Sequence, residues 1–458
     1  MPRPSLSRPA LFRPVPPASV VPRRVRRLCR IALLPLIFLV ACGGASLPSS
    51  ATDGTPPTPA PGPVTPVPGP TPTPAPAPTP TPAPAPTPAP APATGACRAT
   101  ITNDVTVPTT AVHTPGAACD YLINGVIFVT SLLEIQPGTV LQFSQDSDLY
   151  INNGGVLNAV GTPTARIKMI GLNKTKGYWN GISFNGARPS RIEYTDIESA
   201  GQTGYYKNYA AVSGVDGSLS FKHNTVSGSY ATGMAISDDN RLHITDFADN
   251  VFYDNLGYGL RVSSQQTSIL DAASDYTGQS RGLPNGSPYI RLDWDDTYNS
   301  TTLHKLNAPY FASIALYYKG GLLTIEPGVK IVMDSGTAFN LHGGAIHAVG
   351  TAAEPIIFTG EKPENGYWDG IDLFYSGSSQ NLMDHVQVLY GGAGKGADVY
   401  VGNGSYLKIQ NSALSHSSGY GVCLDSIEIL DAHASVDIGA GMTYADNPAG
   451  NVNLDACN

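Results

Sequence analysis

The 458-residue chain is poor in charged residues, in tryptophan and in helix-forming patterns. Charged residues make up only 14% of it, and it has three tryptophans, six methionines and six cysteines. So low a charge argues against a set of solvated helices, whose exposed faces need charged side chains. The motifs of serine hydrolases, phosphate-binding loops and zinc peptidases are also missing, so we assign no catalytic residue.

Acidic residues are missing from the N-terminal segment. Residues 1–41 contain eight arginines, no lysine and no acid, and an arginine-rich run at 23–27 precedes an eleven-residue apolar stretch at 31–41. This stretch is too short to span a bilayer as a helix, whereas a basic start and a short apolar core are typical of a secretory signal peptide. We therefore assign residues 1–41 to a signal peptide and expect export.

The signal ends in Leu39-Val40-Ala41-Cys42, which resembles the lipobox of bacterial lipoproteins. The resemblance implies cleavage before Cys42 and a diacylglycerol on its thiol. The exported protein would then be anchored to a bacterial membrane, at the cell surface. The alternative is an ordinary signal peptide followed by an incidental Cys42.

Loss of the leader changes the charge of the protein. Of the 27 basic residues, 19 remain once the eight leader arginines are removed, and 35 acids oppose them, which leaves a net charge near −16. So acidic a surface repels nucleic acid and anionic lipid, and we expect neither as a partner. The link to the membrane is expected from the N-terminal lipid.

A proline-rich stretch follows the lipidation site. Residues 56–92 contain 19 prolines in 37 positions, alternating mainly with Ala and Thr. Proline at this density favours extended polyproline II, which gives a semi-rigid stalk on the order of 110 Å. We assign residues 42–96 to the lipidated N-terminus and this disordered stalk.

Four cysteines follow the stalk: Cys97, Cys119, Cys423 and Cys457. An even number in an exported chain indicates disulfides, and the absence of a Cys-x-x-Cys pair argues against zinc. Four cysteines allow three connectivities. Their grouping at the two ends favours Cys97 with Cys119 and Cys423 with Cys457, within an N-terminal cap at 97–120 and a C-terminal cap segment at 451–458.

The rest of the chain consists of short alternating runs bounded by Gly, Asn, Asp or Pro, which predict many short strands. LLEIQPGTVLQF at 132–143 recurs as LLTIEPGVKIVM at 322–333, and GYWNGISF at 177–184 recurs as GYWDGIDLF at 366–374. A finer period of 26 residues relates Asn224 to Asn250. Such self-similarity predicts a solenoid of stacked coils, because one coil cannot bury its apolar face alone.

These phrases resemble the repeats of right-handed parallel β-helix proteins with the pectin-lyase-like architecture. The resemblance rests on the Ile/Leu-x-Pro-Gly turn, the Ala-Val-Gly-Thr turn and Gly-Tyr-Trp-x-Gly-Ile, and it covers about residues 120–450. It implies an all-β fold with a parallel β-helix over 121–450. Two related halves, 121–270 and 309–450, would flank an irregular excursion at about 270–308. The architecture hosts many activities, so it says little about function.

Alternation along the strands predicts which side chains point into the solenoid. Met234, Leu260 and Val422 take equivalent inward positions in three copies of the finer repeat. Cys423 is then expected on the outside, like Arg261. An outward Cys423 near the last coil can be reached by a returning tail, which would cover the open end of the solenoid.

Trp179 and Trp368 occupy the same place in the repeated Gly-Tyr-Trp-x-Gly phrase. A functional interpretation makes the two indoles stacking platforms for sugar rings. A structural interpretation makes them corner residues that pack on the adjacent coil. We favour the corner, because binding residues sit on variable loops whereas this phrase is repeated with the framework.

The third tryptophan, Trp294, lies in RLDWDDTYN, which has no counterpart in the other half. Asp293, Asp295 and Asp296 are weak candidates for calcium, which prefers several oxygen ligands. They lack the spacing and the central glycine of an EF-hand, so a solvated acidic turn is the preferred interpretation. No other cofactor is indicated.

We therefore expect a non-catalytic, lipid-anchored cell-surface β-helix protein with an envelope-structural, adhesive or glycan-binding role. Its expected partners are the membrane, polysaccharide and envelope proteins. The alternative is a surface polysaccharide lyase or glycoside hydrolase. The two differ in whether one sheet face carries several outward acids together with a lysine or arginine.

Overall fold

The computed structural model describes residues 97–458 except 103–109, 203–208, 237–241, 294–295, 426–432 and 456–458. The described residues all belong to one compact unit, which spans 86–458. The predicted signal peptide, Cys42 and the predicted stalk lie outside the described residues. No helix within the described ranges is long and apolar enough to cross a membrane.

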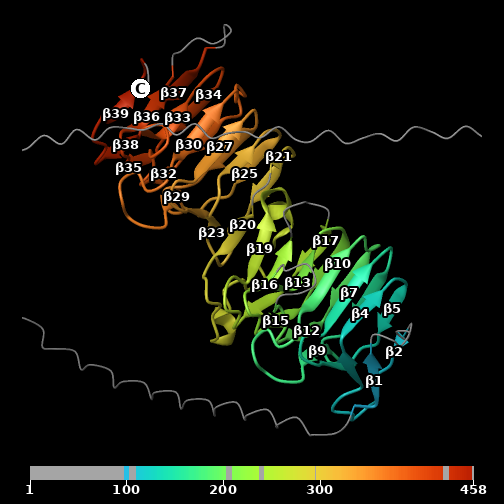
Figure 1. Ribbon diagram of the computed structural model, residues 1–458. Coiled ribbons are helices and arrows are strands. Elements are labelled where there is room, and N and C mark those ends of the chain that lie inside the picture. Colours follow the sequence, from blue (N-terminus) through green and yellow to red (C-terminus); the bar gives the residue numbers. More distant parts are fainter. Residues whose placement is uncertain are drawn as a thin grey trace, which may run out of the picture. The chain divides into compact units, whose positions relative to one another are not determined.

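The chain folds into a parallel β-solenoid, which confirms the all-β prediction (Figure 1). Successive coils each add a strand to the same sheet, and the described strands pair in parallel, as β7 with β10 and β27 with β30. The longest sheet contains 13 strands, so the solenoid has about 13 coils. Helix is limited in the described residues to two short 3-10 helices, η1 (Ser264–Ile269) and η2 (Gln279–Arg281).

The 13-stranded sheet runs through both halves of the repeat, and we call it the central sheet. Its strands are, in spatial order, β4 (Val126–Val129), β7 (Asp148–Asn152), β10 (Gly181–Asn185), β13 (Ala210–Gly214), β16 (Thr232–Ile236), β19 (Leu260–Ser263), β20 (Ile290–Asp293), β23 (Tyr310–Ala312), β26 (Lys330–Met333), β29 (Ile356–Gly360), β32 (Val386–Leu389), β35 (Ala413–Ser415) and β38 (Thr443–Ala445).

Two sheets complete the coils of the first half. The β9 sheet contains β1 (Ala99–Thr102), β3 (Tyr121–Asn124), β6 (Val140–Phe143), β9 (Ile167–Gly171), β12 (Thr195–Glu198), β15 (Thr225–Ser227) and β18 (Val251–Tyr253). The β8 sheet contains β2 (Thr110–Ala111), β5 (Leu132–Ile135), β8 (Val156–Val160), β11 (Ser190–Glu193), β14 (Gly217–Lys222) and β17 (Leu242–Ala248).

Two further sheets complete the coils of the second half. The β27 sheet contains β21 (Asp296–Thr297), β24 (Leu316–Tyr318), β27 (Ala338–His342), β30 (Gly370–Phe374), β33 (Ala397–Val401), β36 (Tyr420–Leu424) and β39 (Gly450–Asn453). The β28 sheet contains β22 (Thr301–Leu303), β25 (Leu322–Ile325), β28 (Ala345–Val349), β31 (Leu382–Asp384), β34 (Tyr406–Gln410) and β37 (Ser435–Ile438).

The halves join where β19 pairs with β20, with Arg261 opposite Arg291. β20 to β22 belong to regular coils, so part of the segment expected to be irregular at 270–308 is strand. The excursion lies between β19 and β20. Within it, η1 packs on the second half through hydroxyl contacts from Ser264 to Thr297 and from Thr267 to Thr301. It thereby covers the first strands of two sheets, whose edges would otherwise be open.

Equivalent strands of the two halves lie in different sheets. The repeated phrase at 177–184 contributes β10 to the central sheet, whereas its copy at 366–374 contributes β30 to the β27 sheet. The repeats themselves do not contain this change. It arises at the junction of the halves. There β19, which has the same position in its coil as β10, pairs with β20, and β20 in turn pairs with β23. In the second half, the strands equivalent to β10 therefore lie in a sheet separate from the central sheet, and their outward side chains lie on that sheet.

The interior of the solenoid is apolar and contiguous through both halves. Met234, Leu260 and Val422 are fully buried in it, as the alternation predicts. Buried asparagines line the corners and account for the 26-residue period. The Asn250 side chain accepts a hydrogen bond from the backbone N–H of Asn224, 3.1 Å away in the preceding coil. This ladder satisfies corner backbone groups that the strands leave unpaired.

The disulfide between Cys97 and Cys119 is present, as predicted for the N-terminal cap. Cys423 is also disulfide-bonded. Cys457 lies outside the described residues, so the pairing of these two remains a prediction. One expectation needs correction: Cys423 is on the outward side of its strand but is fully buried, packed with Ala397 and Tyr400 in a small cluster separate from the main core. Ala397, Tyr400 and Cys423 are therefore covered although they lie outside the main core.

Candidate functional site

Trp179 and Trp368 are both fully buried. The Trp179 indole stacks on Phe143, with ring centroids 3.8 Å apart, and its Nε1 donates to the carbonyl oxygen of Glu198 at 2.9 Å. Trp368 Nε1 donates to the carbonyl oxygen of Leu389 at 2.8 Å. The two partners are equivalent positions on the following coil. Buried rings offer no face to a sugar, so the geometry supports the corner interpretation and not a glycan platform.

The acidic turn at 293–296 is occupied by ion pairs rather than by an open ligand set. Asp293 accepts from Arg261 at 2.9 Å and lies 3.3 Å from Arg291. Asp296 pairs with Lys319 at 2.7 Å. Trp294 and Asp295 lie outside the described residues, and within the described ranges no group of three His, Cys, Asp or Glu side chains is arranged for a metal. Calcium binding at this turn gains no support from these contacts.

The outward side of the β27 sheet differs in its side chains from the matching surface of the first half. Strand register aligns one outward row across it, with Tyr317 beside Asn340, Asn340 beside Asp372 and Asp372 beside Tyr400. A second row places His342 beside Phe374. We call these six side chains the outer face.

In the first half the matching outward positions carry other side chains: Phe128, Tyr150, Ser183 and Ser213 in the first row, and Asn152 and Asn185 in the second. The inward residues of the same strands keep their character, as Ile182 and Ile371 show. An acid, an imidazole and a second phenol have thus replaced serine and asparagine on an unchanged framework.

Asp372 and His342 form the polar centre of the outer face. His342 Nε2 lies 3.7 Å from Asp372 Oδ2, which is too long for a hydrogen bond. Both His342 Nε2 and Asp372 Oδ1 are buried atoms without a hydrogen-bond partner among the described residues. A buried polar atom left unpaired costs about 1–3 kcal/mol, and the rest of each side chain reaches the surface, with His342 33% and Asp372 16% exposed.

Aromatic rings surround this pair in several orientations. The His342 ring packs edge-on against Tyr317, with centroids 5.5 Å apart, and lies tilted against Phe374, also at 5.5 Å. Tyr375, next to Phe374, is 51% exposed. The lysine Nζ of Lys395 lies 5.2 Å from the centre of the Tyr400 ring. Polar groups among partly exposed aromatic faces are the usual composition of a small-molecule or sugar site.

The Tyr400 phenol at the edge of this face is held protonated. Burial raises the pKa of Tyr400, and the carboxylates of Asp425 and Asp372 raise it further. Its hydroxyl donates a short hydrogen bond to Asp425. Tyr400 therefore borders the face as a neutral phenol and does not act as a base.

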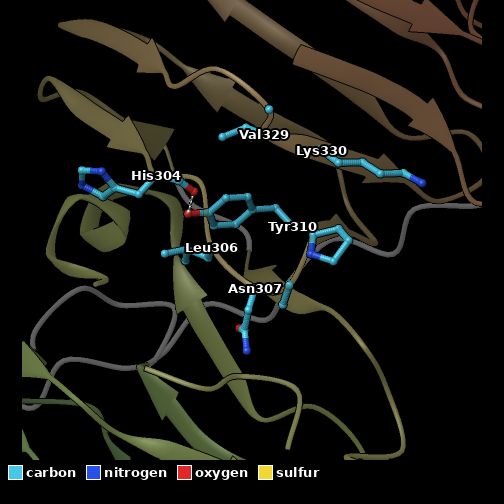
Figure 2. A pocket seen from close by; sticks show the side chains of 9 residues that line it. His304, Leu306, Asn307, Tyr310, Val329 and Lys330 are labelled. Atoms are coloured by element: carbon cyan, nitrogen blue, oxygen red, sulfur yellow. Dashed lines mark hydrogen bonds between the residues drawn. The ribbon is translucent and has the colours of Figure 1, made fainter. Parts of the chain in front are cut away.

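A recess of about 250 Å³ lies elsewhere, between the segment 304–310 and the turn at 328–330 (Figure 2). The polar groups of His304, Asn307 and Tyr310 already have partners within the protein. The Tyr310 hydroxyl donates to the His304 carbonyl oxygen at 3.1 Å, and the His304 ring contacts Glu326 at 2.8 Å. Asn307 donates to Asp275 at 2.7 Å. These satisfied contacts are typical of a structural corner, so we do not assign this recess as the site.

Sequence reasoning identified the repeated phrase around Asp372 but not the outer face. Alternation in GIDLF places Asp372 outward between two inward residues, which was the available signal. His342 is 30 positions earlier, and only the register between β27 and β30 brings it beside Asp372.

Comparison with known proteins gives no further assignment. No protein family, no curated protein and no solved structure matches this chain.

Proposed function

We propose that this protein is an exported, lipid-anchored surface solenoid that binds glycan through the outer face and carries out no chemistry on it. The observation that carries the proposal is the polar pair His342 and Asp372, whose side chains are 33% and 16% exposed, set among aromatic rings. Sugars combine hydroxyl groups, which both donate and accept, with apolar ring faces. Both features match this surface.

The N-terminal sequence supports the location. An arginine-rich start, a short apolar segment and Cys42 precede a stalk of 19 prolines in residues 56–92. A lipid at one end of an extended stalk holds the solenoid away from the membrane, where it can meet extracellular material. The right-handed, pectin-lyase-like form of the solenoid is part of the same proposal.

A glycan array probed with the purified protein, with and without calcium, tests the binding function. We expect retention on a restricted set of glycans and no dependence on calcium. Retention that requires calcium would instead favour a metal site at the 293–296 turn. Failure to bind any glycan would remove the basis for this function and leave an envelope-structural or protein-adhesive role.

A second candidate function is cleavage of a surface polysaccharide. It is favoured by one observation, the outward carboxylate and imidazole of Asp372 and His342 separated by 3.7 Å. Such a pair has the composition of a general acid and base. Incubation of the protein with each retained glycan, followed by measurement of reducing ends and of unsaturated products, separates the two functions. Release of either product would establish catalysis.

A further inference from the structure

A groove of about 260 Å³ crosses four coils of the second half at the corner between the β28 sheet and the central sheet. This corner is not part of the outer face, which belongs to the β27 sheet. Residues at the groove include Pro355, His385, Gln387, Asn411, Ala413 and Thr443. Neighbouring parallel strands are about 4.8 Å apart, so the groove runs for about 14 Å across the coils.

The first half shows what can fill this corner. Asp196 accepts a hydrogen bond from Arg166 Nε at 2.7 Å and one from the Thr225 hydroxyl at 2.8 Å. Beside this network the rings of Tyr194 and His223 stack with centroids 4.3 Å apart. The contacts link successive coils and cover the corner with side chains.

The second half carries other groups at the matching positions, and all of them except Gln387 are smaller than their first-half counterparts. Strand register pairs Asp196 with Thr225 in the first half and Gln387 with Ala413 in the second. Pro355 stands where Arg166 stands, directly before the strand. His385 stands where Tyr194 stands, and Asn411 stands where His223 stands. All of them have the same left-handed backbone conformation. The framework is therefore unchanged, and the groove exists because the filling side chains are absent.

The groove presents neutral polar groups. Two carboxylates lie beside it, and the first, Glu354 directly before Pro355, pairs with Lys305 at 2.5 Å. The second, Asp384, accepts from Gln410 at 2.7 Å and from Asn411 at 2.9 Å and contacts His385 at 2.8 Å. Burial alone would raise the pKa of Asp384, but these partners hold it below the usual value. Its charge is thus already engaged within the protein.

Two side chains in the groove retain their hydrogen-bonding capacity. Neither the Gln387 amide nor the Thr443 hydroxyl makes a side-chain hydrogen bond among the described residues. An amide and a hydroxyl each donate and accept, which suits the hydroxyl groups of a neutral sugar.

An extended peptide is less suited to the groove, because it would need free backbone groups to pair with. The corner backbone is engaged between coils. Asn411 N–H donates to the Ala440 carbonyl at 2.9 Å, and Thr443 N–H donates to that of Ser412 at 2.9 Å. A polyanion is disfavoured by the net charge near −16 of the mature chain. We propose that this corner groove binds a linear, uncharged polysaccharide laid across successive coils, as a second site independent of the outer face.

The first half supplies the design of a test. The triple variant Pro355→Arg, Gln387→Asp and Ala413→Thr transplants the Arg166–Asp196–Thr225 network into the groove. Because that network fits the same framework, the variant should melt at the parent temperature. The probes are soluble β-1,4-, β-1,3- and α-1,4-linked glucan oligosaccharides. Polygalacturonate and an extended-peptide library are the charged and the peptide comparison ligands. Each is titrated into the full-length protein by calorimetry.

We expect the parent to bind at least one neutral glucan and the filled variant to bind it at least tenfold more weakly. The control is the first-half variant Ser183→Ala with Asn152→Ala, which lies outside both proposed sites and should bind the glucan like the parent. The outer-face variant Asp372→Asn with His342→Gln is titrated in parallel, so that glucan bound at the outer face is measured separately from glucan bound in the groove. If the triple variant melts lower, the double variant Pro355→Arg with Ala413→Thr, which introduces the two larger side chains, replaces it, with the same expected loss. The proposal would be overturned if the parent and the filled variant bound the glucan equally, or if the parent bound no glucan. It would also be overturned if the filled variant lost only the binding of polygalacturonate or of peptide.

Discussion

The indole Nε1 of Trp179 donates a 2.9 Å hydrogen bond to the carbonyl oxygen of Glu198, which lies on the next coil. Trp368 makes the equivalent bond to Leu389 in the second half. The phrase Gly-Tyr-Trp-x-Gly was therefore duplicated because each half needs a corner residue that ties one coil to the next. A ring that is fully buried and satisfied by a backbone carbonyl leaves nothing for a ligand to contact.

Truncation of either tryptophan should destabilise the solenoid. Trp179→Ala and Trp368→Ala each remove a fully buried ring and should lower the free energy of unfolding by about 3–5 kcal/mol. Each coil contacts only its neighbours, so amide exchange should rise first in the coils around the substituted corner. Denaturant unfolding and hydrogen exchange measure both effects. Unchanged stability with lost glycan retention would restore the sugar-platform interpretation.

Loss of the first disulfide should weaken the N-terminal cap. Cys97 and Cys119 are separated by 22 positions, and closing a loop of this size is worth about 3 kcal/mol through the unfolded chain. Cys119→Ala should therefore lower the melting temperature, and a reductant should have no further effect on this cap. The control is the parent protein with reductant. A variant that melts like the oxidised parent would show that the cap does not limit stability.

Cys42→Ser should move the protein from the membrane fraction to the soluble exported fraction, because stable anchoring needs more than one acyl chain and the lipidated cysteine supplies them. The fold should not change, since Cys42 lies outside the compact solenoid unit, 86–458. Fractionation together with mass spectrometry of the N-terminal peptide checks the prediction. A variant that stays with the membrane would contradict lipidation at Cys42.

Asp398 should oppose folding at neutral pH. Its side chain is fully buried, Oδ1 accepts from Gly391 N–H at 2.9 Å, and burial raises its pKa well above the usual value. The folded state therefore binds the proton more tightly than the unfolded chain, whose pKa is about 3.9. The stability from this group is fully present below about pH 4 and is lost as the pH rises through the folded pKa.

Asp398→Asn keeps the Oδ1 acceptor without the charge. The variant should melt higher than the parent at pH 7.5, and the difference should shrink towards pH 4. Calorimetric melting at both pH values is the measurement. A variant that is less stable at pH 7.5 would mean that the carboxylate has a stabilising partner at neutral pH.

The repeated framework could be predicted from the sequence because it is local. LLEIQPGTVLQF and its copy each became two strands around a Pro-Gly turn, β5 with β6 and β25 with β26. Alternation also placed Met234 and Leu260 inward correctly. The exchange of sheets between the halves could not be predicted, since it depends on the pairing of β19 with β20 across an excursion.

The outer face could be predicted only in part. The outward direction of Asp372 follows from its own strand, but its neighbours His342 and Tyr400 come from other coils and meet it only through register. The burial of Cys423 was missed for a related reason. Alternation gives the side of a strand on which a residue lies, but it does not show whether that side is covered.

Glycan affinity measured on two matched variants tests most directly whether the second half carries the binding surface. Asp372→Asn with His342→Gln alters the outer face, and Ser183→Ala with Asn152→Ala alters the equivalent positions of the first half. Loss of hydrogen bonds to a carboxylate, worth about 1.5–3 kcal/mol, should weaken binding of the array-selected glycan about 10- to 100-fold in the first variant. The second variant should bind like the parent, and both should melt like it. Equal affinity in the two variants, whether both unchanged or both reduced, would contradict a glycan site on the outer face.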